Sequence, residues 1–190
     1  MHRTGKAALL ERAARVRLAL FDVDGVLTDG RLLLGDRGQE YKAFHTRDGQ
    51  GLTMLRDGGI EIGIVSGRSS AAVGKRVAEL GITLVYQGRL DKLAVLNAIL
   101  GKRKLDASEV AYVGDDLPDL PVLTRVGLAV AVADAHELVQ RHAHMSTTRP
   151  GGQGAVREVC ELILEARGTL ANHYAGTTVL YPLLFTWGAL

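Results

Sequence analysis

Acidic side chains follow two short apolar runs in this sequence, and their spacing points to metal chemistry. A pair follows residues 16–21 and a group of three follows residues 110–113: Asp22 and Asp24, then Asp115, Asp116 and Asp119. Carboxylates crowded at one edge of a sheet repel one another unless a cation lies among them, and hard oxygen ligands of this kind suit Mg²⁺. The sequence therefore predicts a magnesium site.

Two other residues supply groups that contact phosphate: Ser66, directly after an apolar run, and Lys92, at a predicted helix start. Mg²⁺ keeps several waters and shares its coordination with phosphate oxygens, while a lysine ammonium and a serine hydroxyl bind the same group. The combination favours phosphoryl transfer. In that chemistry Asp22 attacks phosphorus to give an aspartyl-phosphate, and Asp24 protonates the leaving oxygen.

The apolar runs that must position these groups have the length of buried strands. They cover residues 16–21, 60–65, 82–86, 110–113 and 127–132. Segments with helical periodicity separate them, so we predict an α/β fold, a Rossmann-like doubly wound parallel sheet with helices on both faces. In such a sheet ligands bind at the carboxyl ends of the strands, where the acidic residues lie.

Capping residues predict where the intervening helices begin and end. Three residues are expected to act as N-caps: Asp48 for residues 49–56, Ser69 for 71–80 and Asp91 for 92–100. Gly81 and Gly101 are expected to end two of these helices.

A different pattern occupies residues 28–44. Three consecutive leucines, Leu32, Leu33 and Leu34, precede a glycine-rich turn and a second strand-like stretch, which predicts a small β-hairpin insertion. The insertion is too short to form a separate cap domain. We expect one domain over residues 1–168, followed by an apolar tail over 169–190 that is too short and too interrupted by Pro182 to span a membrane.

The site residues together resemble the four motifs of the haloacid dehalogenase-like phosphohydrolases. The matching segments are DVDGVLT at residues 22–28, Ser66, Lys92, and GDD at 114–116. Two more segments, FHTRDG at 44–49 and GGQGAVRE at 151–158, resemble the 3-deoxy-D-manno-octulosonate 8-phosphate (KDO 8-phosphate) phosphatases of that family. The resemblance extends to about residue 167.

The resemblance implies a role for each matched residue. Asp22 would be nucleophile and metal ligand, and Asp24 general acid and base with its backbone carbonyl on Mg²⁺. Asp115 would be the third metal ligand, and Ser66, Gly67 and Lys92 would bind phosphate. Asp116 and Asp119 are left open as further ligands or as residues that orient the ligands.

The activity implied by the resemblance is Mg²⁺-dependent hydrolysis of KDO 8-phosphate through an aspartyl-phosphate, in lipopolysaccharide precursor biosynthesis, by a homotetramer whose hairpins pair. One alternative is a phosphatase of another sugar-acid phosphate, such as a nonulosonate 9-phosphate. The other alternative is a non-enzymatic phospho-receiver domain. In receiver domains the acidic pair comes first along the chain and the lysine last, whereas in this sequence Asp115 and Asp116 come after Lys92.

Cationic residues near the site are candidates for binding the rest of the substrate. Arg68 follows Ser66 and Gly67, and a guanidinium recognises a carboxylate through two hydrogen bonds. Arg76 and His45 are weaker candidates for substrate binding, since a surface role suits Arg76 and a capping role suits His45.

Composition narrows the class of protein. The net charge is +2, from 23 basic and 21 acidic residues without a long basic block, so we expect no nucleic-acid partner. The single cysteine, Cys160, lies in a helical apolar pattern and is expected to be a core residue. A lone cysteine and an N-terminus without a secretory apolar segment lead us to expect a cytoplasmic protein.

Overall fold

A six-stranded parallel sheet forms the centre of the molecule, with strand order β5-β4-β1-β6-β7-β8. The computed structural model describes residues 5–174 of the chain. The strands of the sheet are β1 (Leu18–Phe21), β4 (Glu61–Val65), β5 (Leu84–Tyr86), β6 (Val110–Gly114), β7 (Leu128–Ala131) and β8 (Met145–Ser146). The five predicted strands are confirmed, and β8 is an addition that sequence reasoning missed.

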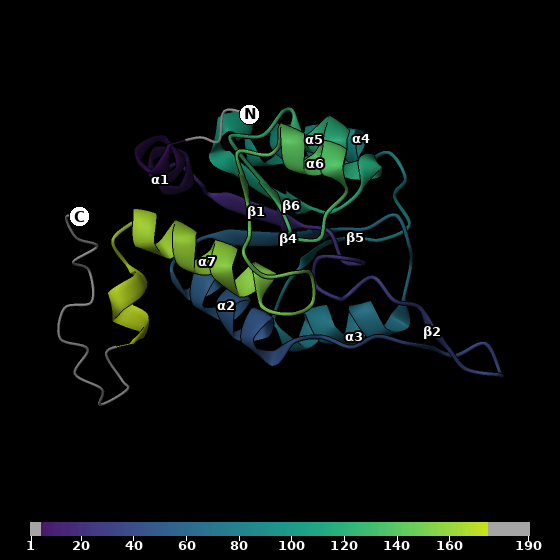
Figure 1. The fold of residues 1–190 in the computed structure, drawn as a ribbon. Helices are drawn as coiled ribbons and strands as arrows, with labels where there is room; N and C mark the ends of the chain where they lie inside the picture. The colour runs from purple at the N-terminus through teal and green to yellow at the C-terminus, as the bar shows by residue number, and fades with distance from the viewer. Residues whose placement is uncertain (1–4, 175–190) are drawn as a thin grey trace.

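Helices cover both faces of this sheet. They are α1 (Lys6–Ala14), α2 (Thr46–Asp57), α3 (Ala71–Glu79), α4 (Lys92–Arg103), α5 (Leu120–Leu123), α6 (Glu137–His142) and α7 (Ala155–Ala166). Figure 1 shows α4, α5 and α6 on one side of the sheet and α2, α3 and α7 on the other. Every residue of β1 and β6 is buried, because strands covered on both faces need apolar side chains on both. The Rossmann-like prediction is confirmed.

The apolar face of α7 packs against α2 and supplies much of the core on that side of the sheet. Val159, Cys160 and Ile163 are fully buried there. Cys160 is therefore the core residue that its apolar surroundings predicted.

Two of the predicted N-caps were wrong. His45, rather than Asp48, caps α2, because its Nδ1 accepts a hydrogen bond from the backbone N–H of Arg47 at 3.2 Å. Ser70, rather than Ser69, stands at the N-cap of α3, without a side-chain capping bond. Asp91 caps α4 as predicted, accepting from the N–H of Ala94 at 2.9 Å.

The predicted helix ends were also partly wrong. Gly81 has a φ of +68° directly after Leu80, the C-cap of α3, as expected. Gly101 instead lies inside α4, which continues to Arg103 and ends at Lys104 with a left-handed φ of 54°.

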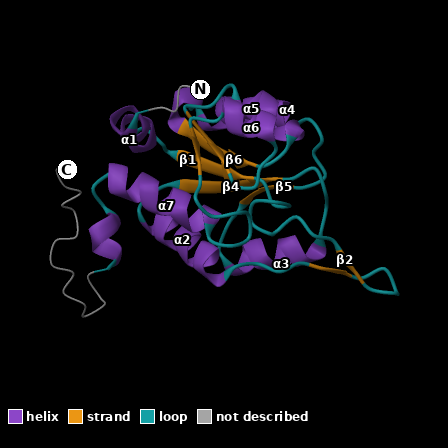
Figure 2. Cartoon of the chain, viewed as in Figure 1, coloured by secondary structure: helices purple, strands orange, loops and turns teal. Residues whose placement is uncertain are grey.

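The predicted hairpin is present and projects from the body of the molecule (Figures 1 and 2). It consists of β2 (Leu33–Leu34) and β3 (Glu40–Tyr41), paired antiparallel. Its apolar side chains are exposed: Leu32, Leu33, Leu34 and Tyr41. An isolated two-stranded hairpin with such a surface is marginal alone and invites association.

The predicted tail lies mostly outside the described residues, which end at Tyr174 after the short 3₁₀ helix Leu170–His173. Within the described part of the chain, no helix is long and apolar enough to cross a bilayer.

Candidate active site

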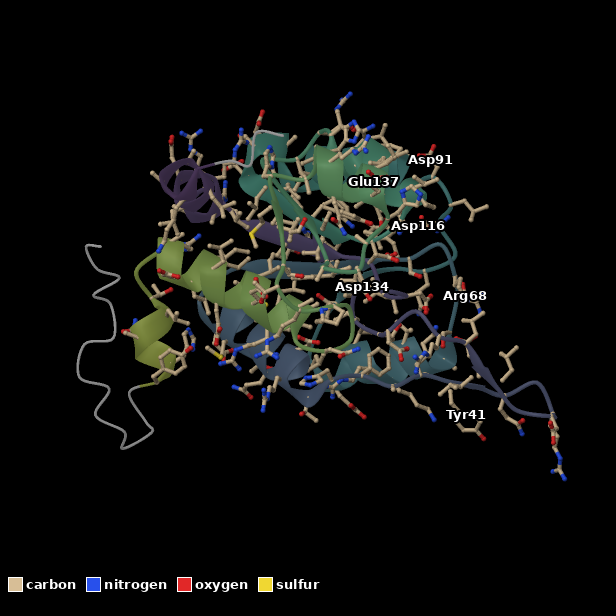
Figure 3. The ribbon with its side chains drawn as sticks, in the orientation of Figure 1. Tyr41, Arg68, Asp91, Asp116, Asp134 and Glu137 are labelled. Carbon is tan, nitrogen blue, oxygen red and sulfur yellow. The ribbon has the colours of Figure 1, made fainter. Side chains whose placement is uncertain are left out.

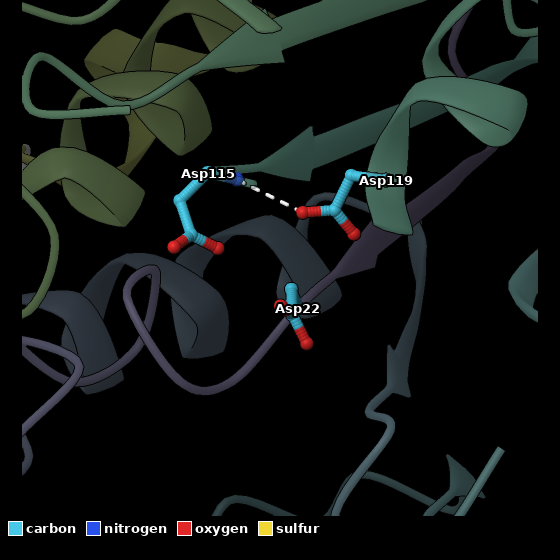
Figure 4. Close-up of side chains that lie close together, drawn as sticks. All are labelled: Asp22, Asp115 and Asp119. Carbon is cyan, nitrogen blue, oxygen red and sulfur yellow. Dashed lines mark hydrogen bonds between the residues drawn. The ribbon is translucent and has the colours of Figure 1, made fainter. Parts of the chain in front are cut away.

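The first two carboxylates of the site stand at the ends of neighbouring strands. Asp22 follows β1 and Asp115 follows β6, and the backbone N–H of Asp22 donates to the carbonyl of Val113 at 3.0 Å. Asp119 folds back toward both from the 3₁₀ helix Leu117–Asp119 (Figure 4). One carboxylate oxygen from each of the three lies within 4.8 Å of the others. We call these three residues, with Lys92, the carboxylate site.

Lys92 gives the carboxylate site its positive charge. It is the first residue of α4, is 5% exposed, and places its Nζ 3.0 Å from Asp22 Oδ2 and 2.7 Å from Asp119 Oδ1. Burial favours the neutral amine, but the carboxylates of Asp22 and Asp119 outweigh it, so the pKa of Lys92 lies above its usual value. The ammonium is therefore charged at neutral pH.

Asp119 is fully buried, and both of its carboxylate oxygens are used by the protein. Oδ1 accepts from Lys92 Nζ and from the hydroxyl of Tyr112, the latter at 2.6 Å. Oδ2 accepts from the backbone N–H groups of Asp115 at 2.9 Å and Asp116 at 3.2 Å. Asp119 thus orients Lys92 and the loop after β6, while Asp116 is exposed and accepts from the N–H of Leu117 at 2.8 Å.

Burial and neighbouring negative charges act together on the two carboxyls at the strand ends. Burial, followed by repulsion from Asp119, raises the pKa of Asp22 to about 6, although Lys92 opposes this. Burial, followed by repulsion from Asp22 and Asp119, raises the pKa of Asp115 to about 8. In addition, Oδ1 of Asp115 is buried and lacks a hydrogen-bond partner among the described residues. Closely spaced hard oxygen donors with excess charge and a spare buried lone pair fit Mg²⁺.

Two glycines let the loop after β1 close over this site. Gly25 has a φ of +90°, and a Cβ there would lie 2.1 Å from Asp115 Oδ2. A Cβ at Gly151 would lie 1.8 Å from the carbonyl oxygen of Gly25. Both positions therefore require glycine, and the backbone of residues 151–154 packs directly on the loop that carries Asp22 and Asp24.

The predicted phosphate binders lie at the same edge of the sheet. Ser66 and Gly67 follow β4, which pairs with β1, so that Ser66 stands beside the strand that ends at Asp22. Ser66 is 3% exposed, and its Oγ accepts from the backbone N–H of Arg68 at 3.2 Å. The structure thus places Ser66 at the same edge of the sheet as Asp22 and Lys92, and the binding of phosphate by these residues stays a prediction.

The Asp24 carboxylate lies in a second group of charges, which we call the rim cluster: Asp24, Glu40, Lys42 and Arg68. Lys42 forms an ion pair with Asp24, and Arg68 Nε lies 3.8 Å from Asp24 Oδ2. Figure 3 shows Arg68 on the same side of the molecule as the hairpin residue Tyr41. Sequence reasoning missed Glu40 and Lys42, because a charged residue on a hairpin gives no sign of the group it will meet.

His45 and Arg76 lie near each other, away from the carboxylate site. Both line a small cavity between α2 and α3, together with Phe44 and Leu80. Arg76 forms an ion pair with Glu79 at 3.2 Å, and the imidazole of His45 caps α2. Their expected contact with substrate remains a prediction.

This fold and site define a class of protein, since a Rossmann-like sheet with such an acidic edge suits metal-assisted phosphoryl transfer. The sequence pattern of the haloacid dehalogenase-like hydrolases matches residues 84–158.

Individual relatives identify the subfamily within these hydrolases. A Yersinia pestis protein named 3-deoxy-D-manno-octulosonate 8-phosphate phosphatase is 48% identical over 85% of this chain and 87% of its own. The crystal structure of a Moraxella catarrhalis phosphatase of the same name, in complex with magnesium, phosphate and KDO, is similar with a TM-score of 0.87 and 42% identity, covering 88% of this chain and 96% of the other. The crystal structure of a probable YrbI-family phosphatase from Pseudomonas syringae has a TM-score of 0.88 and 51% identity, covering 89% and 96%.

The chain therefore belongs to the family of 3-deoxy-D-manno-octulosonate 8-phosphate phosphatases within the haloacid dehalogenase-like hydrolases.

Proposed function

We propose that this protein is a Mg²⁺-dependent phosphatase that hydrolyses KDO 8-phosphate to KDO and phosphate, a step in lipopolysaccharide precursor biosynthesis. The observation that carries the proposal is the carboxylate site, in which Lys92 stands between Asp22 and Asp119 beside the buried, partnerless Oδ1 of Asp115. The names of the relatives support the choice of substrate.

In this proposal the reaction has two displacements at phosphorus. A carboxylate oxygen of Asp22 attacks phosphorus, the bond from phosphorus to the sugar oxygen breaks, and Asp24 gives its proton to that oxygen. Water then attacks the aspartyl-phosphate and gives a proton to Asp24, which releases phosphate and restores Asp22. Asp24 therefore acts first as an acid and then as a base.

Lys92, Ser66 and Gly67 hold the phosphoryl group while this happens. The Lys92 ammonium, kept charged by its two carboxylate neighbours, attracts the phosphoryl oxygens and lowers the basicity of Asp22. Asp119 is a positioning residue, since its four hydrogen bonds fix Lys92 and the backbone of Asp115.

The carboxylates of Asp22 and Asp115 and the backbone carbonyl of Asp24 would hold the magnesium ion. When bound, Mg²⁺ neutralises the repulsion between carboxylate and phosphate and stabilises the charge that develops on the phosphoryl oxygens.

Arg68 is the residue we propose for the carboxylate of the substrate, because it lies next to Asp24 and is half exposed, with 48% of its side chain accessible. His45 and Arg76 remain proposed as outer substrate contacts.

We also propose that the protein is a cytoplasmic homotetramer in which hairpins of different subunits pair. The exposed leucines of the hairpin support the assembly, since their burial would be favourable and would place neighbouring chains over each site. Residues 1–168 would form the catalytic domain of each subunit.

The test is phosphate release by the purified protein from KDO 8-phosphate, a nonulosonate 9-phosphate and a pentose 5-phosphate, with Mg²⁺ and with a chelator. We expect kcat/KM to be highest for KDO 8-phosphate and activity to disappear with the chelator. A higher kcat/KM for the nonulosonate 9-phosphate would show that this ester, rather than KDO 8-phosphate, is the substrate. Hydrolysis that continues in the presence of the chelator would contradict the proposed metal dependence.

A further inference from the structure

The rim cluster contains a carboxylate that the proposed reaction does not use. Glu40, on β3 of the hairpin, places Oε2 3.1 Å from Arg68 Nη2 and Oε1 2.9 Å from Lys42 Nζ. The same two cations also pair with Asp24. The cluster thus holds two carboxylates and two cations, with no net charge.

Glu40 is less firmly held than the other carboxylate that these cations share. Asp24 belongs to the loop that packs beneath residues 151–154, whereas Glu40 belongs to a strand of two residues on a projecting hairpin. Oε1 of Glu40 is buried and lacks a well-formed hydrogen bond, although Lys42 is near. The ammonium of Lys42, first, and the guanidinium of Arg68 lower the pKa of Glu40, so that it is charged at neutral pH.

The leaving group of the reaction must come to this cluster. Asp24 protonates the sugar oxygen, so the sugar lies beside the Asp24 carboxylate and hence beside Lys42 and Arg68. A sugar carboxylate that takes two hydrogen bonds from the Arg68 guanidinium must compete with Glu40, whose Oε2 lies 3.1 Å from Arg68 Nη2. Exchanging one carboxylate for the other leaves the charge of the rim cluster unchanged.

We propose that Glu40 is a specificity-determining residue. In the free enzyme its carboxylate pairs with Arg68 and Lys42; on binding, the substrate's carboxylate displaces Glu40 from these two cations. After the reaction Glu40 pairs with them again and so promotes release of the sugar-acid product. This inference rests on the proposed function. A sugar phosphate without a carboxylate gains nothing from displacing Glu40. Glu40 therefore affects the binding only of ligands that carry a carboxylate.

The experiment compares Glu40→Gln with the unaltered enzyme, using free KDO and inorganic phosphate as inhibitors. Glutamine keeps the shape of the side chain but loses the charge, so we expect the inhibition constant of KDO to fall about three- to fivefold, the upper range for one exposed ion pair. Inorganic phosphate carries no sugar carboxylate, and its inhibition constant should change by less than about twofold. The KM for KDO 8-phosphate should fall relative to that for a pentose 5-phosphate.

Two further variants separate this role from a general effect of charge. Glu61→Gln removes a carboxylate that pairs with Arg103 on another part of the surface. This variant should change neither the inhibition constant of KDO nor that of inorganic phosphate. In an Arg68→Ala background, Glu40→Gln should have a smaller effect on KDO, because one of the two cations that the carboxylates share is gone and only Lys42 remains.

Three results would overturn the proposal: an inhibition constant for KDO that rises or stays the same in Glu40→Gln, an equal fall for phosphate, or an undiminished effect in the Arg68→Ala background. A rise in particular would mean that Glu40 binds the sugar itself. Calorimetric titration of both proteins with KDO needs no turnover. If the unaltered enzyme failed to hydrolyse KDO 8-phosphate, this titration would still decide the role of Glu40 separately from the proposed function.

Discussion

The carboxylate site and the rim cluster use the same kinds of charged side chain, but the chain holds them in different ways. Asp22, Asp115 and Lys92 follow buried strands or begin a long helix, and Asp119 is fully buried. Glu40 and Lys42 come from the hairpin; the side chain of Lys42 is 1% exposed, that of Glu40 20% and that of Arg68 48%. Buried charges with many partners are costly to disturb, whereas an ion pair with an exposed member, such as Glu40 with Arg68, contributes little and exchanges easily. The difference assigns chemistry to the first group and selection among substrates to the second.

Asp22→Asn should give the largest effect, because an amide cannot attack phosphorus. We expect turnover to be lost, with folding intact by circular dichroism and Mg²⁺ present at saturation. Near-normal phosphate release by that variant would show that another group is the nucleophile.

Asp24→Asn tests the member of the rim cluster that takes part in chemistry. A general acid contributes about 10²- to 10⁴-fold, so kcat/KM for KDO 8-phosphate, which reports the formation of the aspartyl-phosphate, should fall by that factor. Aryl phosphates have leaving groups that need little protonation, and kcat/KM for 4-nitrophenyl phosphate should fall much less. Equal losses of kcat/KM on both substrates would contradict the proton-donor role.

Asp119→Ala should cost the metal-free protein about 3–5 kcal/mol in free energy of unfolding, because Lys92 and two backbone N–H groups lose a buried acceptor. Urea denaturation measures this. Asp116→Ala is the matched control, since that exposed carboxylate caps a 3₁₀ helix and its loss should cost about 1 kcal/mol. Similar losses in the two variants would mean that the buried network is not what stabilises the loop.

Leu33→Asp tests the hairpin as an assembly surface. Each leucine buried between subunits contributes about 1.5–3 kcal/mol, so a charge at this position should dissociate the tetramer and lower activity together. Light scattering at the assay concentration measures the mass. A fully active monomer would refute the shared cover over the site and leave the carboxylate site unaffected.

The pH dependence of stability without metal tests the carboxylate site alone. The pKa values of Asp22 and Asp115 are raised from 3.8 to about 6 and about 8, so the folded protein holds protons that the unfolded chain has released. The free energy of unfolding should therefore fall as pH rises from about 4 to 8, by up to about 1.4 kcal/mol per pH unit for each carboxyl.

Mg²⁺ should reverse this trend, because it replaces those protons. The stabilisation by saturating Mg²⁺ should be larger at pH 8 than at pH 6, as measured by urea denaturation. Asp115→Asn should remove most of the pH dependence above pH 6. A stability that rises with pH in the chelated protein would contradict the raised pKa values.

The sequence was sufficient to predict the strands that carry the chemistry. Strands buried on both faces are continuous apolar runs, and the groups after them must meet at one edge, so Asp22, Ser66 and Asp115 could be placed without coordinates. Strand β8 has two half-buried residues, Met145 and Ser146, and no such run marks it. The N-cap of α2 was assigned to Asp48, an ideal capping type, although a capping role also suited His45. Asp48 is instead buried and accepts from the N–H groups of Gly154 and Arg157 at the start of α7.

Roles that depend on a partner distant in sequence could not be predicted. The function of Asp119 follows from Lys92 and Tyr112, which reach it from another helix and from the strand beneath. The involvement of Lys42 follows from how the hairpin folds against Asp24, and a short exposed hairpin carries little sequence pattern to show it. Local sequence thus predicts elements and their ends, while side-chain pairing across elements requires the fold.

The buried position of Cys160 makes the chain convenient for labelling. It is the only cysteine in the sequence, it is fully buried in α7, and burial raises the pKa of its thiol, so thiolate-directed reagents should not reach it in the folded protein. A second cysteine introduced at Leu34, which is 69% exposed on the hairpin, would then be the single site that reacts with a maleimide dye. Energy transfer between subunits carrying donor and acceptor dyes at that position would report hairpin pairing as it forms and breaks in solution.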